Sequence, residues 1–290
     1  MWYQLSIGPC SQIEVEELSQ LLEDHEALSI TLLDKNDDPV LEPEPGTTPL
    51  WPEIIVHAIF AEAQMAQIAK EAIENQFIGI AVNLDTVADQ DWERAWMADF
   101  KPVCFGKRLW VCPTWHSPPD PEAANLMLDP GLAFGTGTHP TTSLCLRWLD
   151  QACLQDKSII DYGCGSGILA LAALKLGAGS VAAVDIDAQA LQATLNNAVT
   201  NQIDAPQLQV SHPDALVMPV DLIIANILLL PLLGLQSRFI TLLKPQGILV
   251  VSGILEEQIP QLMQAYQPQF NVVSTKTDAG WGLIELRRNS

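Results

Sequence analysis

The sequence predicts an α/β protein with two domains: a small α+β sandwich, followed by a larger, mostly parallel sheet with helices on both faces. Three observations support this fold class. The chain has 290 residues, which exceeds the usual size of a single domain. Strand and helix patterns in residues 1–84 follow the order βαββαβ. From Ser158 onward, apolar strands alternate with helical segments.

The first domain is predicted from six segments. Short apolar runs mark its strands, and apolar residues on one side mark its helices. The segments are a strand at Trp2–Ile7, a helix at Gln12–Glu23, strands at Ala27–Leu33 and Glu53–Phe60, a helix at Ala61–Asn75 and a strand at Phe77–Leu84. This order is the split βαβ, or ferredoxin-like, arrangement, which names no function by itself.

Proline clusters mark a loop and a boundary. Residues 34–52 contain five prolines, which indicates an exposed loop between the two middle strands. A second cluster begins at Pro113 and ends at Pro121. We therefore expect a first domain at 1–85, a linker at 86–121 and a second domain at 122–290.

The second domain is predicted to be a doubly wound sheet with an antiparallel end. Its parallel strands are expected at Ser158–Tyr162, Val181–Asp185, Gln207–Val210, Leu222–Asn226 and Ile248–Ser252. Only a short turn separates Asn271–Lys276 from Leu283–Arg287, which forces an antiparallel pair. This is the seven-stranded, Rossmann-like plan of class I methyltransferases, whereas the dinucleotide-binding sheet is entirely parallel.

The glycine-rich loop Asp161–Gly167 follows the first of these strands, where open α/β sheets bind ligands. Gly163 and Gly165 allow close approach of a cofactor to the backbone. The Asp161 carboxylate favours a cationic ligand, such as the methylsulfonium of S-adenosylmethionine. Asp185 ends the next strand, at the spacing where an acidic side chain accepts hydrogen bonds from ribose hydroxyls.

The same features fit NAD, so a dehydrogenase is an alternative. Against it, Ile168 stands where the dinucleotide fingerprint has glycine or alanine. The glycine- and threonine-rich segment Asp129–Thr142 precedes the first strand and is expected to close over a ligand, with Phe134 and Thr138 as candidate cofactor contacts. Its other interpretation is an interdomain linker with helix-capping threonines.

Charge and cysteine content restrict partners and compartment. The formal net charge is −21, and residues 1–120 hold 21 of the 35 acidic side chains but only 6 of the 14 basic ones. Such a field disfavours nucleic acid and anionic membranes. The acidic residues of this region form either a solvated surface or a docking face for a basic partner. The six cysteines show no metal-ligand spacing and no leader is evident, so we expect no metal and a cytoplasmic location. We also expect a monomer.

Four segments together resemble a known family. They are Asp129–Thr142, Asp161–Gly167, Val184-Asp185-Ile186-Asp187 and Asn226-Ile227-Leu228. Over nearly the whole chain, the sequence is similar to the bacterial methyltransferases of large-subunit ribosomal protein eleven. The resemblance implies methyl transfer to lysine ε-amines and the N-terminal α-amine of that protein. It also implies an N-terminal substrate-recognition domain, with Thr142, Gly163, Asp185 and Asn226 at cofactor-binding positions.

Amine methylation needs an aligned, unprotonated acceptor. A carbonyl group of Asn226 is the candidate for orienting the lone pair of the amine, which makes Asn226 the expected catalytic residue. His139 is a candidate base by position, although a histidine before a proline also has a purely structural interpretation. Two alternatives to the ribosomal substrate stay open: another protein or small amine as acceptor, and a noncatalytic binder of basic ribosomal proteins.

Overall fold

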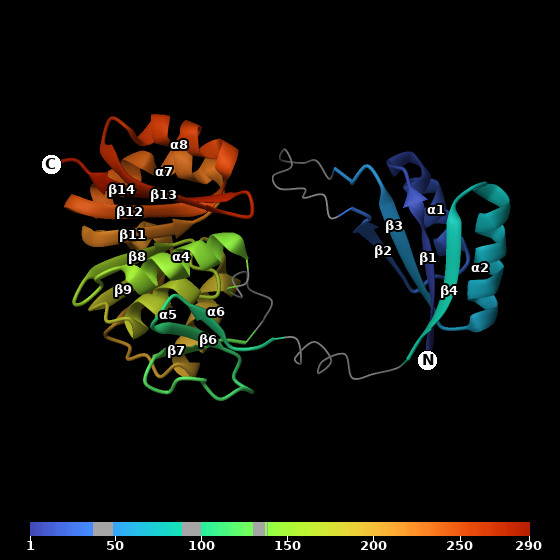
Figure 1. The fold of residues 1–290 in the computed structure, drawn as a ribbon, viewed down its shortest axis with the longest axis horizontal. Helices are drawn as coiled ribbons and strands as arrows, with labels where there is room; N and C mark the ends of the chain where they lie inside the picture. The colour runs from blue at the N-terminus through green and yellow to red at the C-terminus, as the bar shows by residue number, and fades with distance from the viewer. Residues whose placement is uncertain (37–48, 89–99, 130–136, 138) are drawn as a thin grey trace. The chain divides into compact units, whose positions relative to one another are not determined.

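The computed structural model describes residues 1–36, 49–88, 100–129, 137 and 139–290 (Figure 1). The chain forms two compact units, Met1–Met97 and Ala98–Ser290. Two candidate cofactor contacts, Phe134 and Thr138, lie outside the described residues.

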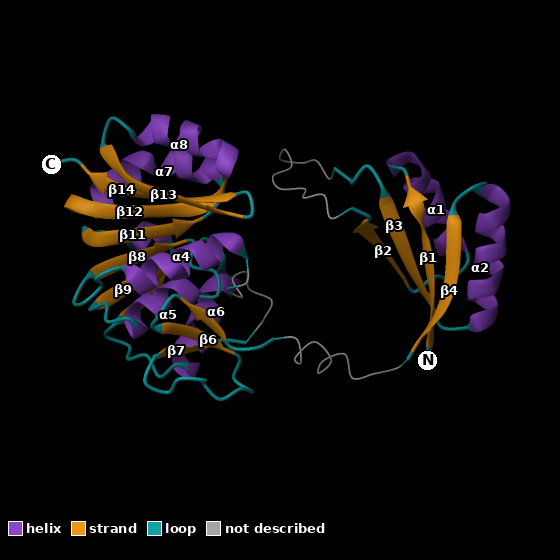
Figure 2. Cartoon of the chain, in the orientation of Figure 1, coloured by secondary structure: helices purple, strands orange, loops and turns teal. Residues whose placement is uncertain are grey.

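The first unit is the expected α+β sandwich. Its elements are β1 (Trp2–Cys10), α1 (Gln12–Asp24), β2 (Ser29–Asp34), β3 (Ile54–Phe60), α2 (Ala63–Gln76) and β4 (Ala81–Val87). The strands form an antiparallel sheet in the order β2-β3-β1-β4, and both helices pack on it (Figure 2). Every second residue of β3 is buried, from Ile54 to Phe60, because alternate side chains of a strand point to the same face.

The second unit contains the expected seven-stranded sheet. Its elements after the first helix, α4 (Pro140–Gln151), are β8 (Ser158–Tyr162), α5 (Ile168–Lys175), β9 (Ser180–Val184), α6 (Ala188–Thr200), β10 (Leu208–Ser211), β11 (Val220–Asn226), α7 (Leu229–Leu242), β12 (Leu243–Leu255), α8 (Ile259–Tyr266), β13 (Phe270–Asp278) and β14 (Trp281–Arg288). The strand order is β10-β9-β8-β11-β12-β14-β13. The fold class predicted from the sequence is therefore confirmed.

The predicted hairpin ends this sheet. Strand β14 is antiparallel to both β12 and β13, and Asp278 pairs with Trp281 across the turn. Ala279 and Gly280 make the turn with φ values of 48° and 81°. Two residues are too few for a parallel crossover, so the chain reverses direction.

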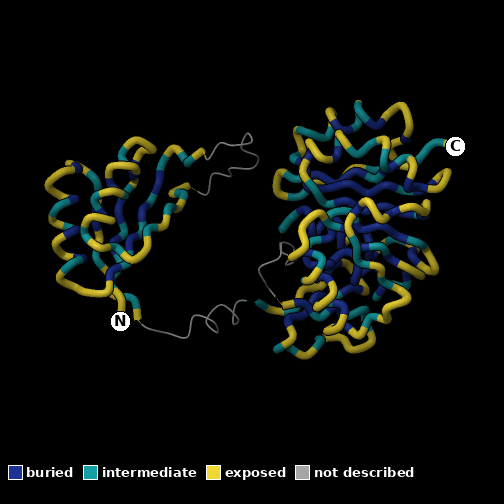
Figure 3. Tube along the Cα trace, turned by 180° about the vertical axis from the view of Figure 1, so that it is seen from behind, coloured by how far each residue is buried: buried dark blue, intermediate teal, exposed yellow. Residues whose placement is uncertain are grey.

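Buried apolar side chains cover both faces of the seven-stranded sheet. The strands form the buried centre of the unit, drawn in dark blue in Figure 3. One core joins the sheet to α4, α5 and α6, and the other joins it to α7 and α8. The parallel strands are buried on both faces, which explains their continuous apolar runs. Of the helices that the structure describes, none is long and apolar enough to cross a membrane.

The segment 86–121, expected as a linker, contains two short strands of the second unit. Strands β5 (Val103–Phe105) and β6 (Leu109–Cys112) form a three-stranded sheet with β7 (Ala124–Met127). Phe105 and Leu109 are buried in the core that covers α4 and α5. The prolines after Cys112 therefore lie between two strands that pair with each other.

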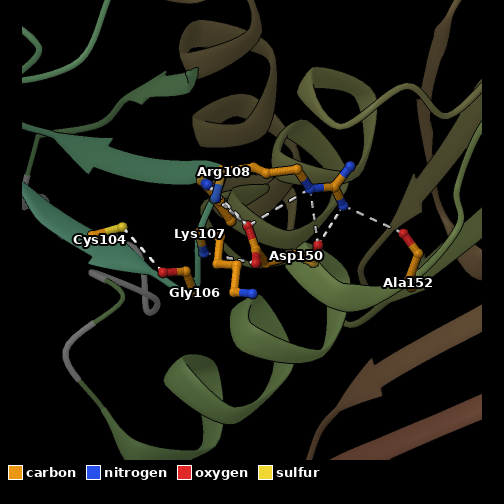
Figure 4. Close-up of polar contacts among 7 residues, drawn as sticks. Cys104, Gly106, Lys107, Arg108, Asp150 and Ala152 are labelled. Carbon is orange, nitrogen blue, oxygen red and sulfur yellow. Dashed lines mark hydrogen bonds and ion pairs between the residues drawn. The ribbon is translucent and has the colours of Figure 1, made fainter. Parts of the chain in front are cut away.

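Asp150, near the end of α4, holds the turn between β5 and β6 (Figure 4). Its carboxylate accepts hydrogen bonds from the backbone N–H groups of Lys107, Arg108 and Leu109 at 2.8, 2.7 and 3.0 Å. The Arg108 guanidinium donates to the backbone oxygen of Asp150. Gly106 adopts a φ of 99°, and a Cβ there would lie 2.2 Å from Asp150 Oδ2. The Asp150 carboxylate thus occupies the space that a side chain at position 106 would need.

Candidate active site

The glycine-rich loop lies at the carboxyl end of β8, bound to the end of β9. The N–H groups of Gly163 and Cys164 donate to the backbone oxygen of Val184 at 2.8 and 3.0 Å. Gly163 has a φ of 80°, and a Cβ there would lie 2.4 Å from Ile227 Cγ2. Only glycine fits this backbone conformation and this spacing. The bare backbone of the loop forms one wall of a cavity.

Asp185 follows β9 and is fixed by two backbone donors. Its Oδ2 accepts from the Gly165 N–H at 3.0 Å, and its Oδ1 accepts from the Asp187 N–H at 3.0 Å. Each carboxylate oxygen has more than one acceptor direction. The side chain is therefore oriented by the protein while it retains capacity to accept further hydrogen bonds.

Asn226, the last residue of β11, lies beside Thr142 of α4, although 84 positions separate them in the sequence. The Nδ2 group of Asn226 donates to Thr142 Oγ1 at 3.3 Å. The Oδ1 atom of Asn226 is buried and has no hydrogen-bond partner among the described residues. Buried polar atoms normally have a partner, so this amide oxygen indicates that a ligand donor belongs there.

These groups surround a single cavity of about 490 Å³, a size typical of small-molecule sites. Five residues expected to bind the cofactor line it: Thr142, Gly163, Gly165, Asp185 and Asn226. The apolar part of the lining includes Ile186, Pro213, Ile227, Pro231 and Leu235. Ile227 belongs to the expected segment Asn226-Ile227-Leu228, whereas Pro213, Pro231 and Leu235 were not expected as site residues. Ile186 carried one signal in the sequence, because it directly follows Asp185, and the structure leaves it 83% exposed.

Asp161 does not line the cavity, although it begins the loop. Its side chain is fully buried, its Oδ2 accepts from the Ala170 N–H at 2.9 Å, and its Oδ1 has no partner among the described residues. Burial raises the pKa of Asp161 to about 7, the Ala170 hydrogen bond opposes this rise, and the nearby Asp185 carboxylate adds to it. Asp161 is thus a residue of β8 whose side chain lies beneath the loop and binds the first turn of α5.

The other titratable groups near the cavity have structural contacts. His139 is the N-cap of α4, where its Nδ1 accepts from the Thr141 N–H at 3.3 Å, and its ring lies edge-on to Trp281. Burial lowers the pKa of His139. Burial also raises the pKa of the Cys164 thiol to about 12, which makes it a poor nucleophile. Within the described ranges, no group of three His, Cys, Asp or Glu side chains could hold a metal ion.

Comparison with known proteins gives the family. The model of the ribosomal protein L11 methyltransferase (PrmA) family matches residues 1–289. The chain belongs to this family. Similar relatives named ribosomal protein L11 methyltransferase occur in Legionella pneumophila strain Corby, with 61% identity over 98% of each chain, and in Hahella chejuensis, with 48% identity over 93% of each chain.

A solved structure agrees with this assignment. The ribosomal protein L11 methylase of Lactobacillus delbrueckii is 32% identical and has a TM-score of 0.61, covering 66% of this chain and all of that one. Ribosomal protein L11 methyltransferases are S-adenosylmethionine-dependent protein methyltransferases, so the cofactor expected from the loop is that of the family. Membership also excludes the NAD-dependent alternative. The cavity suits the cofactor, because it combines a bare glycine backbone, an oriented carboxylate and an unpartnered amide oxygen.

Proposed function

We propose that this chain transfers methyl groups from S-adenosylmethionine to ribosomal protein L11, on lysine ε-amines and on the N-terminal α-amine. The family match over residues 1–289 and the 61% identical relative support this substrate. The observation that carries the site assignment is the buried, unpartnered Asn226 Oδ1 in the wall of the cavity. An amide oxygen in that position accepts a hydrogen bond from an amine.

The cofactor contacts follow from the orientation of each group. We assign the ribose hydroxyls to Asp185, whose carboxylate is held by two backbone donors. The backbone at Gly163 and Gly165 forms the wall against which the cofactor lies, and Thr142 orients Asn226. Asp161 supports the loop from below through its hydrogen bond from the Ala170 N–H. Phe134 and Thr138 stay candidate contacts.

Methyl transfer to an amine is an in-line displacement that requires a free lone pair. When bound, the cofactor supplies a methyl group activated by a positive sulfur. The protein must present the amine unprotonated, although the reference pKa of lysine is about 10.4. Ile227, Pro231 and Leu235 give the cavity an apolar wall, which disfavours the ammonium form by desolvation. Asn226 Oδ1 then accepts one N–H and orients the lone pair.

Substrate recognition is assigned to the first domain. Residues 1–85 contain 16 acidic and only two basic side chains, a surface suited to a basic protein. In this proposal, residues 1–85 recognise the substrate, and the second unit, Ala98–Ser290, which includes β5 and β6, carries out methyl transfer. The protein works as a cytoplasmic monomer, without contacts to nucleic acid or membrane.

The test is methylation of purified, unmethylated L11 with labelled S-adenosylmethionine, followed by mass spectrometry of the modified sites. The expected result for the wild type is label on lysines and on the N-terminus of L11. For Asn226→Ala, kcat should fall at least about 100-fold, an effect typical of losing an orienting polar contact. The control is Asn196→Ala, an exposed amide on α6, which should retain full activity. Label on a different protein in an extract, with none on L11, would contradict the substrate.

A further inference from the structure

A second and larger cavity, of about 750 Å³, lies at the opposite edge of the seven-stranded sheet. The residues that line it show where it lies in the fold. They include Lys157, directly before β8, Asp221 and Leu222, near the start of β11, and the β12 segment from Lys244 to Ile248. In a parallel sheet these positions mark the amino-terminal edge, whereas the methyl-transfer site lies at the carboxyl edge. None of the residues that line the first cavity also lines the second.

The charge of this second cavity is opposite to that of the protein. Four of the chain's 14 basic residues line it, against two acidic ones, in a chain with a net charge of −21. The four are Lys157, Lys244, Lys276 and Arg287. Clefts lined by one sign of charge concentrate the field and attract ions of the opposite sign.

Both acidic side chains of this cavity are already committed to other donors. Asp221 accepts from Lys244 Nζ at 2.9 Å and from the Ser158 hydroxyl at 2.7 Å. Glu285 Oε2 accepts from Trp148 Nε1 at 3.0 Å and from the Ser274 hydroxyl at 3.0 Å. Burial alone would raise the pKa of Asp221, but the Ser158 hydrogen bonds and Lys244 lower it to about 2, so this carboxylate stays ionised.

Of the four cations, only Lys244 is paired with a carboxylate among the described residues, and Lys276 donates to the neutral Gln151 Oε1 at 3.1 Å. Among the described residues, no carboxylate lies within 4.0 Å of the Lys157 ammonium or the Arg287 guanidinium. Both side chains are exposed and free to reach a ligand. The guanidinium fork pairs with two phosphate oxygens at once, and a lysine ammonium adds a point charge.

We propose that this cavity binds a small phosphate-bearing anion, such as pyrophosphate or the phosphates of a nucleotide. The volume is within the range of small-molecule sites. Leu222 and Ile248 supply an apolar part of the lining next to the cations. A small anion can enter this local field, whereas the acidity of the whole chain repels a long polyanion. The site is separate from methyl transfer.

The test is calorimetric titration of the full chain with inorganic pyrophosphate at constant ionic strength. We expect saturable binding that weakens about ten-fold or more in the Lys157→Gln, Arg287→Gln double variant, as for loss of charge-assisted hydrogen bonds. A Lys101→Gln, Lys107→Gln double variant removes the same charge from exposed positions outside the cavity and should bind as tightly as the wild type. Absence of saturable binding, or equal weakening in both variants, would overturn the proposal.

Two measurements on the unmodified chain avoid any effect of substitution on folding. Amide resonances of Gly247 and Ser274, which line the cavity, should shift on titration with pyrophosphate. Shifts confined to other surfaces would refute the assignment. A single-stranded RNA, tested at equal phosphate concentration, should bind more weakly than pyrophosphate; tighter RNA binding that depends on Lys157 and Arg287 would replace the small anion with nucleic acid.

Discussion

Replacement of Asp161 by asparagine tests how the loop is supported. The side chain is fully buried beneath the loop, with one oxygen bound to the Ala170 N–H and the other without a described partner. Burial raises its pKa from 3.8 to about 7, so the folded chain keeps this carboxyl protonated well above its ordinary range. Asparagine has nearly the same shape and is neutral at every pH. The variant should therefore fold and lose the pH dependence that this carboxyl causes.

The sign and size of the effect follow from proton linkage. Between about pH 4 and about pH 7 the folded state binds a proton at Asp161 that the unfolded state has released, so this carboxyl lowers stability as the pH rises. One pKa unit corresponds to about 1.4 kcal/mol. From about pH 5.5 to about pH 8, Asp161 should lower the free energy of unfolding by about 2 kcal/mol.

The assay is urea unfolding followed by tryptophan fluorescence at these two pH values. The free energy of unfolding of Asp161→Asn, minus that of the wild type, should be about 2 kcal/mol larger at the higher pH than at the lower pH. Other carboxylates, such as Asp221, contribute equally to both proteins and cancel in the difference. Asp187→Asn removes the same formal charge from an exposed position and serves as the control. Equal pH slopes for wild type and Asp161→Asn would refute the buried, protonated carboxyl.

Three further predictions concern the site and its support. Asp185→Ala should weaken S-adenosylmethionine binding at least about ten-fold by calorimetry, through loss of hydrogen bonds to a charged group, whereas Asp187→Ala should bind normally because Asp187 does not line the cavity. Asp150→Ala should lower the free energy of unfolding by about 3 kcal/mol or more in urea, since three backbone donors lose their acceptor. Deletion of residues 1–85 should leave cofactor binding intact and abolish methylation of L11; unchanged turnover would place recognition elsewhere.

Much of the fold could be predicted because its signals are local. Apolar alternation and helical periodicity depend on neighbouring residues. The strands of the four-stranded and the seven-stranded sheets were therefore predicted to within a few positions. The terminal hairpin followed from turn length alone. The three-stranded sheet of β5, β6 and β7 was not predicted, because its strands are only three or four residues long and stand near prolines. The turn between β5 and β6 is held by Asp150, more than 40 positions away, through hydrogen bonds that no local pattern contains.

The sequence by itself determined the family, the cofactor loop and the acidic residue after the next strand, because each depends on a motif within a short stretch of chain. Only the tertiary structure decided what each group faces. It turned Asp161 inward onto α5, brought Asn226 to Thr142 across 84 positions, and gathered four basic side chains at the far edge of the sheet. These contacts arise from packing between distant segments, which periodicity and spacing do not encode.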